Sequence, residues 1–245
     1  MTNAERILVV AAHPDDIDFG AAATVARWVD EGREVSYCLV TDGDAGGYDP
    51  TVPRSEIAGI RRAEQTAAAK EVGVTDLAWL GYPDGQVVVS LSLRRDLARV
   101  IRQVRPQLVV CPWPERNWER IFASHPDHMA VGEAAMCAVY PDARNPFTFP
   151  ELAAEGLDAH VVDEVWAMGA LTSDTYVDVT DTFDRKVEAL RRHVSQTARI
   201  PDLSGFLRSW LAANAAAGGL PEGRLAEVFR RIDTSEFRGP PEADG

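Results

Sequence analysis

The stretch ILVVAAHPDD at residues 7–16 decides the fold of this chain. Its first half is a short apolar run rich in β-branched residues, which predicts a buried strand. Polar residues follow the run without a gap, and a helical pattern begins near Gly20. The motif therefore falls at the carboxyl end of a strand that leads into a helix, and open α/β sheets bind their ligands at that edge.

Short strands and longer helical segments alternate along the rest of the chain. Strands are expected at Ile7–Ala11, Val35–Thr41, Leu77–Leu80, Leu108–Cys111 and Val165–Gly169, with a further candidate at Thr175–Val179. Helices are expected at Ala21–Glu31, Ser55–Val72, Leu93–Val104, Asp127–Tyr140 and Asp184–Thr197. This alternation builds βαβ units, so it predicts one α/β, Rossmann-like domain with a mainly parallel sheet flanked by helices.

The length of 245 residues is enough for one sizeable core, and we expect a single domain, residues 1–245, whose core runs to about residue 200. The segment 141–150, rich in proline and aromatic residues, is expected to be an ordered loop near the site. After Pro201 come an alanine-rich helical stretch, a Gly218-Gly219 break and the frayed tail PPEADG. We expect this part at the periphery or in a homo-oligomer contact.

Composition narrows the range of partners. The chain has 38 Asp and Glu against 25 Lys and Arg, a formal net charge of −13. That charge repels phosphate backbones and anionic membrane surfaces, so neither nucleic acid nor a membrane is expected as a partner. No signal peptide and no run of about 18 apolar residues is visible, which predicts a soluble, cytoplasmic protein. The three cysteines lie among apolar neighbours and are expected to be free, buried thiols.

The first motif that carries chemistry is Ala12-His13-Pro14-Asp15-Asp16. His13 and Asp16 offer an imidazole and a carboxylate three residues apart, a mixture that suits zinc, and Asp15 is left as a nearby base. Proline and aspartate are also ordinary turn formers, so turn chemistry alone is the alternative explanation.

The second motif is His125-Pro126-Asp127-His128, directly before an apolar helical pattern. Proline and an acidic residue are normal in a first helical turn, so Asp127 has a structural explanation. Two histidines within four residues are harder to dismiss, because the chain has only five. The remaining two, His160 and His193, fit a polar loop and a helix surface, and no role is assigned to them.

Together the two motifs supply more than either does alone. A catalytic zinc needs about three protein ligands and one open position for water. His13, Asp16 and His128 meet that count, and the residues to spare are a second carboxylate, a second imidazole and a further acid that can orient it. Hydrolysis requires such a base and such a stabiliser, whereas a structural site does not. Fe²⁺ or another divalent ion could replace zinc.

These motifs resemble those of the LmbE-like, or PIG-L, family of zinc-dependent N-deacetylases, which includes the mycothiol and bacillithiol precursor deacetylases. The resemblance runs from about Arg6 to near Thr197 and takes in Arg61-x-x-Glu64 and Pro83-Asp84-Gly85. It implies an enzyme that removes an N-acyl group, most often acetyl, from a small sugar-like substrate such as an N-acetylglucosamine derivative.

The resemblance also implies roles for individual residues. The implied zinc ligands are His13, Asp16 and His128. The implied catalytic residues are Asp15 as general base and His125 as electrostatic stabiliser or general acid, oriented by Asp127. Arg61 and Asp84 match positions that face the substrate in the family, although Arg61 could be a helix-surface charge and Asp84 a turn residue.

Several alternatives stay open at the level of sequence. Within the enzyme class, the rival is an amidase that acts on thiol conjugates or on another N-acyl metabolite. Outside it, the rival is a non-catalytic metabolite-binding protein that keeps a metal for structure. Trp113 and Trp118 suit either stacking on a sugar or filling space under a loop. The glycines of segment 42–47 suit either a close backbone approach to a ligand or a plain flexible turn.

Overall fold

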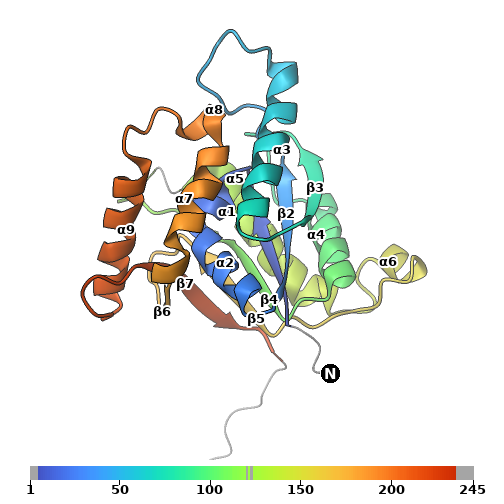
Figure 1. Ribbon diagram of the computed structural model, residues 1–245. Helices are drawn as coiled ribbons and strands as arrows, with labels where there is room; N and C mark the ends of the chain where they lie inside the picture. Colours follow the sequence, from blue (N-terminus) through green and yellow to red (C-terminus); the bar gives the residue numbers. More distant parts are fainter. Residues whose placement is uncertain (1–4, 120, 122–123, 236–245) are drawn as a thin grey trace, which may run out of the picture.

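The computed structural model describes residues 5–119, 121 and 124–235, which form a single α/β domain around one seven-stranded sheet (Figure 1). The strand order is β3-β2-β1-β4-β5-β7-β6. The parallel strands are β1 (Arg6–Ala11), β2 (Glu34–Thr41), β3 (Asp76–Tyr82), β4 (Leu108–Pro112) and β5 (Glu164–Met168). At one side of the sheet, β7 (Ala226–Asp233) runs antiparallel to both β5 and β6 (Thr175–Asp178). The expected mainly parallel α/β fold is therefore confirmed.

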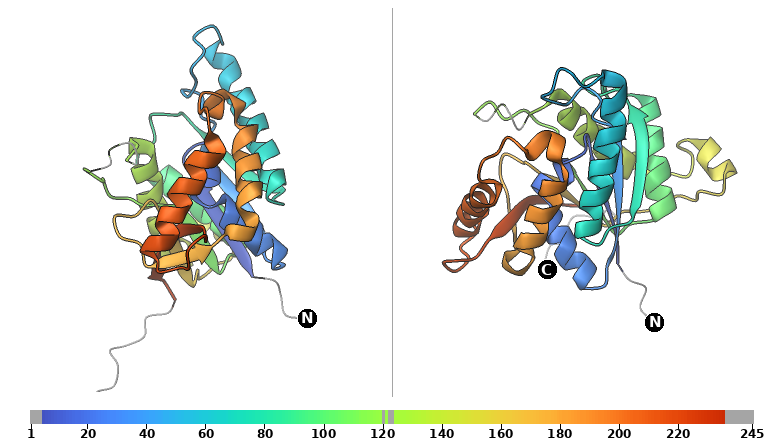
Figure 2. Two further views of the ribbon diagram at one scale, coloured as in Figure 1. Left: turned by 60° about the vertical axis from the view of Figure 1, so that its left-hand side comes forward. Right: turned by 45° about the horizontal axis from the view of Figure 1, so that its top comes forward.

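Helices cover both faces of the sheet. They are α1 (Asp16–Gly20), α2 (Ala22–Asp30), α3 (Arg54–Glu71), α4 (Leu91–Val104), α5 (Pro126–Cys137), α6 (Pro150–Ala154), α7 (Phe183–Arg192), α8 (Val194–Thr197) and α9 (Leu203–Ala217), with a π-helical turn η2 (Ala138–Ala143) and a 3₁₀ turn η3 (Thr180–Thr182). Helix α9 lies beside β6 and β7 at the outer side of the sheet (Figure 2). No helix in the described ranges is long and apolar enough to cross a membrane.

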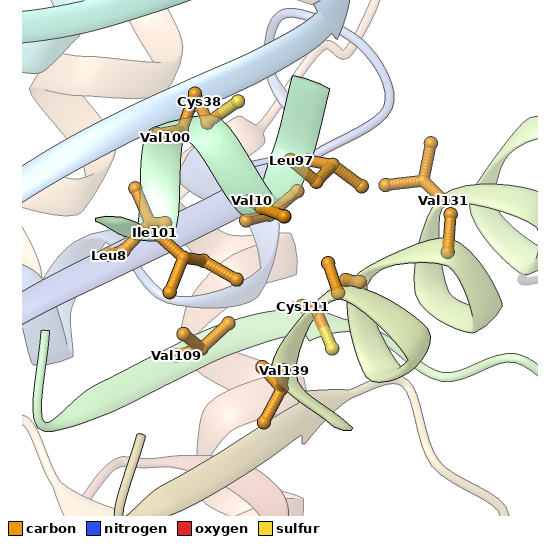
Figure 3. Close-up of a cluster of buried hydrophobic side chains, with 14 of the residues drawn as sticks. Leu8, Val10, Cys38, Leu97, Val100, Ile101, Val109, Cys111, Val131 and Val139 are labelled. Carbon is orange, nitrogen blue, oxygen red and sulfur yellow. The ribbon is translucent and has the colours of Figure 1, made fainter. Parts of the chain in front are cut away.

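Side chains that alternate along β1 build two cores, one on each face of the sheet. Leu8 and Val10 pack with α4 and α5, as Figure 3 shows, whereas Ile7 and Val9 pack with α2 and α3. A parallel strand between two helical layers is apolar on both faces, which explains the continuous apolar run before His13. Because the run is fully buried, the polar motif that follows it has a fixed starting point at the sheet edge.

All three cysteines are free thiols, as expected. Cys38 and Cys111 belong to the core of Figure 3, and burial raises the pKa of each thiol to about 12. Cys137 is half-buried at the end of α5. Neither buried thiol is therefore poised for redox or metal chemistry.

The helices differ from the expected ones at three places. The expected helix at 21–31 is α2 alone, because the backbone of Ala21 leaves the helical region and α1 ends before it. The expected helix at 127–140 becomes π-helical after Cys137 and breaks at Tyr140. The expected helix at 184–197 is interrupted at His193, which separates α7 from α8.

The chain after Pro201 differs most from its expected peripheral place. Helix α9 follows the alanine-rich pattern, but Ala226–Asp233 forms β7, a strand inside the sheet rather than beside it. Glu227, Arg230 and Arg231 make this strand look polar, although Phe229 is fully buried on the sheet. The expected frayed tail at 240–245 lies outside the described residues.

Segment 141–150 is ordered, but the expectation that it lies near the site is wrong. Arg102, buried in the last turn of α4, donates hydrogen bonds to the carbonyl oxygens of Asp142, Ala143, Asn145 and Thr148. The last turn of α4 precedes β4, so the segment lies toward the amino ends of the strands, near α6 on the far right of Figure 1. These hydrogen bonds to the backbone account for the order of the segment away from the site.

Candidate active site

The residues singled out from the sequence converge at the carboxyl edge of the sheet. His13 follows β1, Asp84 follows β3, and α5, which begins after β4, carries Asp127 and His128 in its first turn. The ring of His125 caps this helix, because its Nδ1 accepts a hydrogen bond from the backbone N–H of Asp127 at 3.2 Å. Separate loops are thus joined at one place by the parallel register of their strands.

Three ligand atoms meet between β1 and α5. Nδ1 of His13 lies 3.2 Å from Nε2 of His128 and 3.5 Å from Oδ2 of Asp16, and Nε2 of His128 lies 3.0 Å from Oδ1 of Asp16. Two imidazoles and one carboxylate in this arrangement fit a divalent metal ion such as zinc. The residues present therefore fit a divalent metal ion at this place.

The other nitrogen of His13 faces two carboxylates. Nε2 lies 3.0 Å from Oδ1 of Asp84 and 3.2 Å from Oδ2 of Asp127. A proton on Nε2 satisfies both acids and leaves the Nδ1 lone pair free for a metal, the arrangement by which outer carboxylates orient a metal-binding histidine. A second possible metal group, His13 with His125 and Asp127, lies close by. It would require Nε2 to lose that proton, so we favour the group with Asp16 and His128.

Electrostatics tie the ligand group together. Burial lowers the pKa of His13, but hydrogen bonds and charge from Asp16 and Asp84 outweigh it and raise the pKa to about 11. Burial raises the pKa of Asp16, but the charge and hydrogen bond of His128 bring it well below its usual range. Without a cation the imidazoles must hold protons to pair with Asp16. A divalent ion can replace these protons, so metal binding should release them.

The carboxylate of Asp127 does not hold His125 as the resemblance implied. It is fully buried, and its oxygens accept hydrogen bonds from the backbone N–H groups of Gly85 at 2.7 Å and Val87 at 3.2 Å. Its third neighbour is His13. Only the backbone N–H of Asp127 bonds to the ring of His125. Asp127 therefore joins α5 to the loop after β3 and supports His13.

Burial lowers the pKa of His125, and the charges of His13 and His128 lower it further, whereas Asp127 and Asp84 raise it less. The neutral imidazole is thus favoured. Because Nδ1 accepts the N–H of Asp127, the ring proton of that neutral form is on Nε2. This differs from the expected protonated acid and leaves His125 with one N–H to donate.

Asp15 has an unusual backbone and an unusual acidity. Its φ is 86°, in the left-handed region that few residues other than glycine adopt. Burial and the charge of Asp16 raise the pKa of its carboxyl group to about 7, and the charge of Arg61 partly opposes them. A carboxylate with this pKa is suited to accept a proton near neutral pH.

Arg61 is buried, so its reading as a helix-surface charge is wrong. Its Nη2 donates to the carbonyl oxygen of Pro14 and lies 3.2 Å from Oδ2 of Asp15. Gly43 and Gly46 pack on its guanidinium so closely that a Cβ on either would crowd it. Two of the three glycines of segment 42–47 therefore permit a close approach, but to Arg61.

Asp84 is buried as well, and it is more than a turn residue. Its Oδ2 accepts the backbone N–H of Ala45 at 3.1 Å while its Oδ1 faces His13. It joins segment 42–47 to the candidate metal ligands. A substrate-facing role for Arg61 or Asp84 remains a prediction.

A cavity of about 500 Å³ opens beside Asp16 and His128. Its walls include Trp113, Asn117, Leu171, Trp210 and Asn214. Trp113 thus faces a ligand-sized space, whereas Trp118 is 80% exposed and lies off its walls. The contribution of α9 was missed from the sequence, because the family resemblance ends near residue 197 and carries no signal beyond it.

Sequence reasoning also missed His193. Instead of lying on a helix surface it is fully buried, with Nε2 2.8 Å from Oδ2 of Asp18. Asp18 in turn accepts a hydrogen bond from Nε2 of Gln65 at 2.8 Å. His160 does lie in a polar loop, where its Nε2 is 2.7 Å from the carbonyl oxygen of Pro106.

Comparison with known proteins places the chain among deacetylases. A family model described as PIG-L, GlcNAc-PI de-N-acetylase, matches residues 8–139. A diacetylchitobiose deacetylase of Thermococcus kodakarensis is 32% identical over 192 residues, covering 78% of this chain and 70% of the relative. A 1D-myo-inositol 2-acetamido-2-deoxy-alpha-D-glucopyranoside deacetylase of Rhodococcus erythropolis is 27% identical, covering 84% and 86%.

Solved structures agree. The N,N'-diacetylchitobiose deacetylase of Pyrococcus horikoshii, complexed with its inhibitor MPG, superimposes with a TM-score of 0.85 at 29% identity over 98% of this chain and 88% of that one. The 4-carboxy-2-hydroxymuconate hydratase GalB of Pseudomonas putida reaches a TM-score of 0.78 at 18% identity, which shows the fold alone. With a family match over more than half its length, this chain belongs to the PIG-L family of de-N-acetylases.

Proposed function

We propose that this protein is a zinc-dependent N-deacetylase that hydrolyses the acetamide of a small N-acetylglucosamine derivative. One observation carries the proposal: a half-buried carboxylate with a pKa of about 7, Asp15, directly adjoins a group of three converging metal-ligand atoms. A hydrolase needs both a base and a metal at one point. A binding protein with a structural metal would need no such base.

His13, Asp16 and His128 would hold the metal. When bound, it supplies Lewis acidity to the amide carbonyl and makes water more acidic. The donor set accepts zinc readily, and Fe²⁺ is the main competitor for a site of imidazole and carboxylate. Asp84 and Asp127 would keep His13 in the tautomer that presents Nδ1 to the metal.

Asp15 would take the proton of water, on a carboxylate oxygen, as the water oxygen attacks the amide carbonyl. The Nε2–H of His125 would donate a hydrogen bond to the oxygen that becomes negative in that step. Transfer of a proton to the leaving nitrogen completes the cleavage into acetate and an amine. Asp15, protonated in the first step, is the group that can return that proton.

The substrate would extend from the metal ligands into the cavity lined by Trp113, Trp210 and Asn214. Aromatic faces beside amide groups suit a sugar, which has apolar ring faces and a polar edge. The relatives named above act on N-acetylated sugar compounds, which supports the same substrate class here. An amidase that acts on thiol conjugates or another N-acyl metabolite is the alternative within the same chemistry.

A substrate panel tests this function. Zinc-loaded protein is incubated with N-acetylated mono- and disaccharides and with thiol-sugar conjugates, and amine release is measured against Asp15→Asn protein of equal metal content. We expect release from at least one N-acetylated sugar. Turnover restricted to thiol conjugates would favour the amidase alternative. Tight binding of a sugar without any amine release would favour the non-catalytic alternative.

A further inference from the structure

Asp15 adopts a left-handed backbone conformation, although it is not a glycine. Aspartate tolerates φ of 86° better than most residues, yet the conformation still costs conformational free energy and persists only where neighbours impose it. The side chain of Asp15 does not supply the missing contact, since it makes no capping hydrogen bond at the start of α1. Other residues must therefore hold the peptide that precedes it.

Two residues one turn apart on α3 bind both ends of that peptide. Arg61 donates from Nη2 to the carbonyl oxygen of Pro14, and Oε1 of Gln65 accepts the backbone N–H of Asp15 at 2.9 Å. These two groups belong to the same Pro14–Asp15 peptide unit. Arg61 is 3% exposed and Gln65 is fully buried, so water does not compete for either contact.

We propose that Arg61 and Gln65 form a peptide clamp that positions Asp15 for catalysis, and that Asp18 and His193 support the clamp from behind. The inference rests on the proposed function, in which Asp15 is the base. Arg61 acts on the side chain as well, because the same Nη2 lies 3.2 Å from Oδ2 of Asp15. The clamp thus orients the plane of the peptide and the carboxylate together.

Asp18 decides which way the amide of Gln65 points. Its Oδ2 accepts from Nε2 of Gln65 at 2.8 Å, which leaves Oε1 on the side of Asp15. If the amide of Gln65 were reversed, its N–H₂ group would face the N–H of Asp15, and its oxygen would face the carboxylate of Asp18. Neither pair could form a hydrogen bond. His193 lies 2.8 Å from the same oxygen of Asp18 and keeps it in place. His193, which is 175 positions from Asp18 in the chain, is thereby connected to Asp15 through Asp18 and Gln65.

Gln65→Met tests the clamp, because methionine has a similar length and no hydrogen-bonding amide. Two quantities are measured on the full, zinc-loaded chain: hydrogen exchange at the Asp15 amide, and kcat and KM for the best N-acetylated substrate. We expect exchange at Asp15 to accelerate at least about tenfold and kcat to fall about 10- to 100-fold, because a small misplacement of a reacting group is enough for such a loss. KM and metal content should stay within about twofold of the wild type.

Thr182→Val is the matched control. It also removes a buried hydrogen bond, from Oγ1 to the carbonyl oxygen of Ala23 at 2.8 Å, but has no contact with Asp15 among those described. Its kcat should equal that of the wild type. If both variants lose activity in proportion to lost folding, the role of Gln65 is structural and the proposal is overturned.

Other outcomes are equally decisive. A normal kcat in Gln65→Met, despite faster exchange at Asp15, would overturn the positioning role. If Gln65→Met does not fold, Asp18→Leu takes its place, because leucine offers no acceptor to Nε2 of Gln65, and an unchanged kcat and unchanged Asp15 exchange there would overturn the proposal. A wild-type protein that releases no amine would refute the proposed function instead, while exchange at Asp15 would still report whether the clamp exists.

Discussion

His13 divides its two nitrogens between two tasks. Nδ1 faces the other metal-ligand atoms, while Nε2 faces the carboxylates of Asp84 and Asp127. The sequence motif could identify the residue but not this division, because it depends on loops that follow β3 and β4. For the same reason the partner of Asp127 could not be predicted. The family resemblance implied His125, whereas the buried carboxylate of Asp127 faces His13.

The pKa of Asp15 predicts how activity depends on pH. The carboxyl group of Asp15 must be ionised to act as a base. Burial and the charge of Asp16 raise its pKa to about 7, so the ionised form is lost as the pH falls below about 7. kcat/KM should therefore fall about tenfold per pH unit on the acid side. A bound cation favours the ionised form, so the midpoint should lie at or below about 7.

The acid limb is measured at saturating zinc between about pH 5 and 8, with metal content checked at each pH because protons compete for the ligands. In Asp15→Asn the residual activity should lack this limb. An acid limb of equal position and slope in Asp15→Asn would assign it to another group.

At the level of elements, one buried ion pair joins the split N-terminal helices to the C-terminal strand. Glu227 of β7 accepts the N–H groups of Ala23 and Thr24 at the start of α2. Lys186 of α7 donates to Glu227 at 2.6 Å and to the carbonyl oxygens of Asp18 and Phe19 in α1. Both charges thus complete helix ends that would otherwise be buried without partners.

Lys186→Met should destabilise the protein strongly, because it leaves the carboxylate of Glu227 buried beside α2 without its cation. We expect a loss of about 3–5 kcal/mol in the free energy of unfolding, measured by urea denaturation. Arg191→Met is the control, since it breaks an exposed pair with Glu188 and should cost about 0–1 kcal/mol. Equal losses in the two variants would contradict the stabilising role of the buried pair.

These contacts also explain which elements the sequence could predict. The run before His13 is apolar on every residue, so strand, position and adjacent site followed from it directly. The short helix α1 was missed, and its end and the start of α2 are completed by Lys186 and Glu227, which are distant in sequence. β7 was hidden because Glu227 contributes a charge to a buried strand, and only the ion pair makes that burial tolerable.

At the scale of the whole molecule, the C-terminal third of the chain forms part of the wall of the cavity beside the candidate metal ligands. β7 enters the sheet beside β5, and α9, which precedes β7 in the chain, lines the cavity that begins at Asp16 and His128. The metal-ligand residues come from the family-like part of the chain, whereas Trp210 and Asn214 come from outside it. We expect the first part to fix the chemistry and the second to contribute to substrate choice.

Trp210→Leu tests that division. It removes an aromatic face from the cavity wall, so KM for an N-acetylated sugar should rise by about tenfold while kcat changes little. Trp118→Leu is the matched control, because Trp118 is exposed and off the cavity, and its KM should be unchanged. A rise in KM for Trp118→Leu, with no rise for Trp210→Leu, would show that the sugar contacts the loop after β4 and not α9.

The most direct test of the account compares Asp15→Asn with Asp16→Asn by metal content and kcat on the same substrate. Asp16 contributes a ligand atom, whereas Asp15 supplies the base. We predict that Asp15→Asn keeps one zinc per chain and loses about 100-fold or more in kcat, and that Asp16→Asn loses the metal. Loss of metal from Asp15→Asn with retention in Asp16→Asn, or near-normal turnover in metal-loaded Asp15→Asn, would contradict the account.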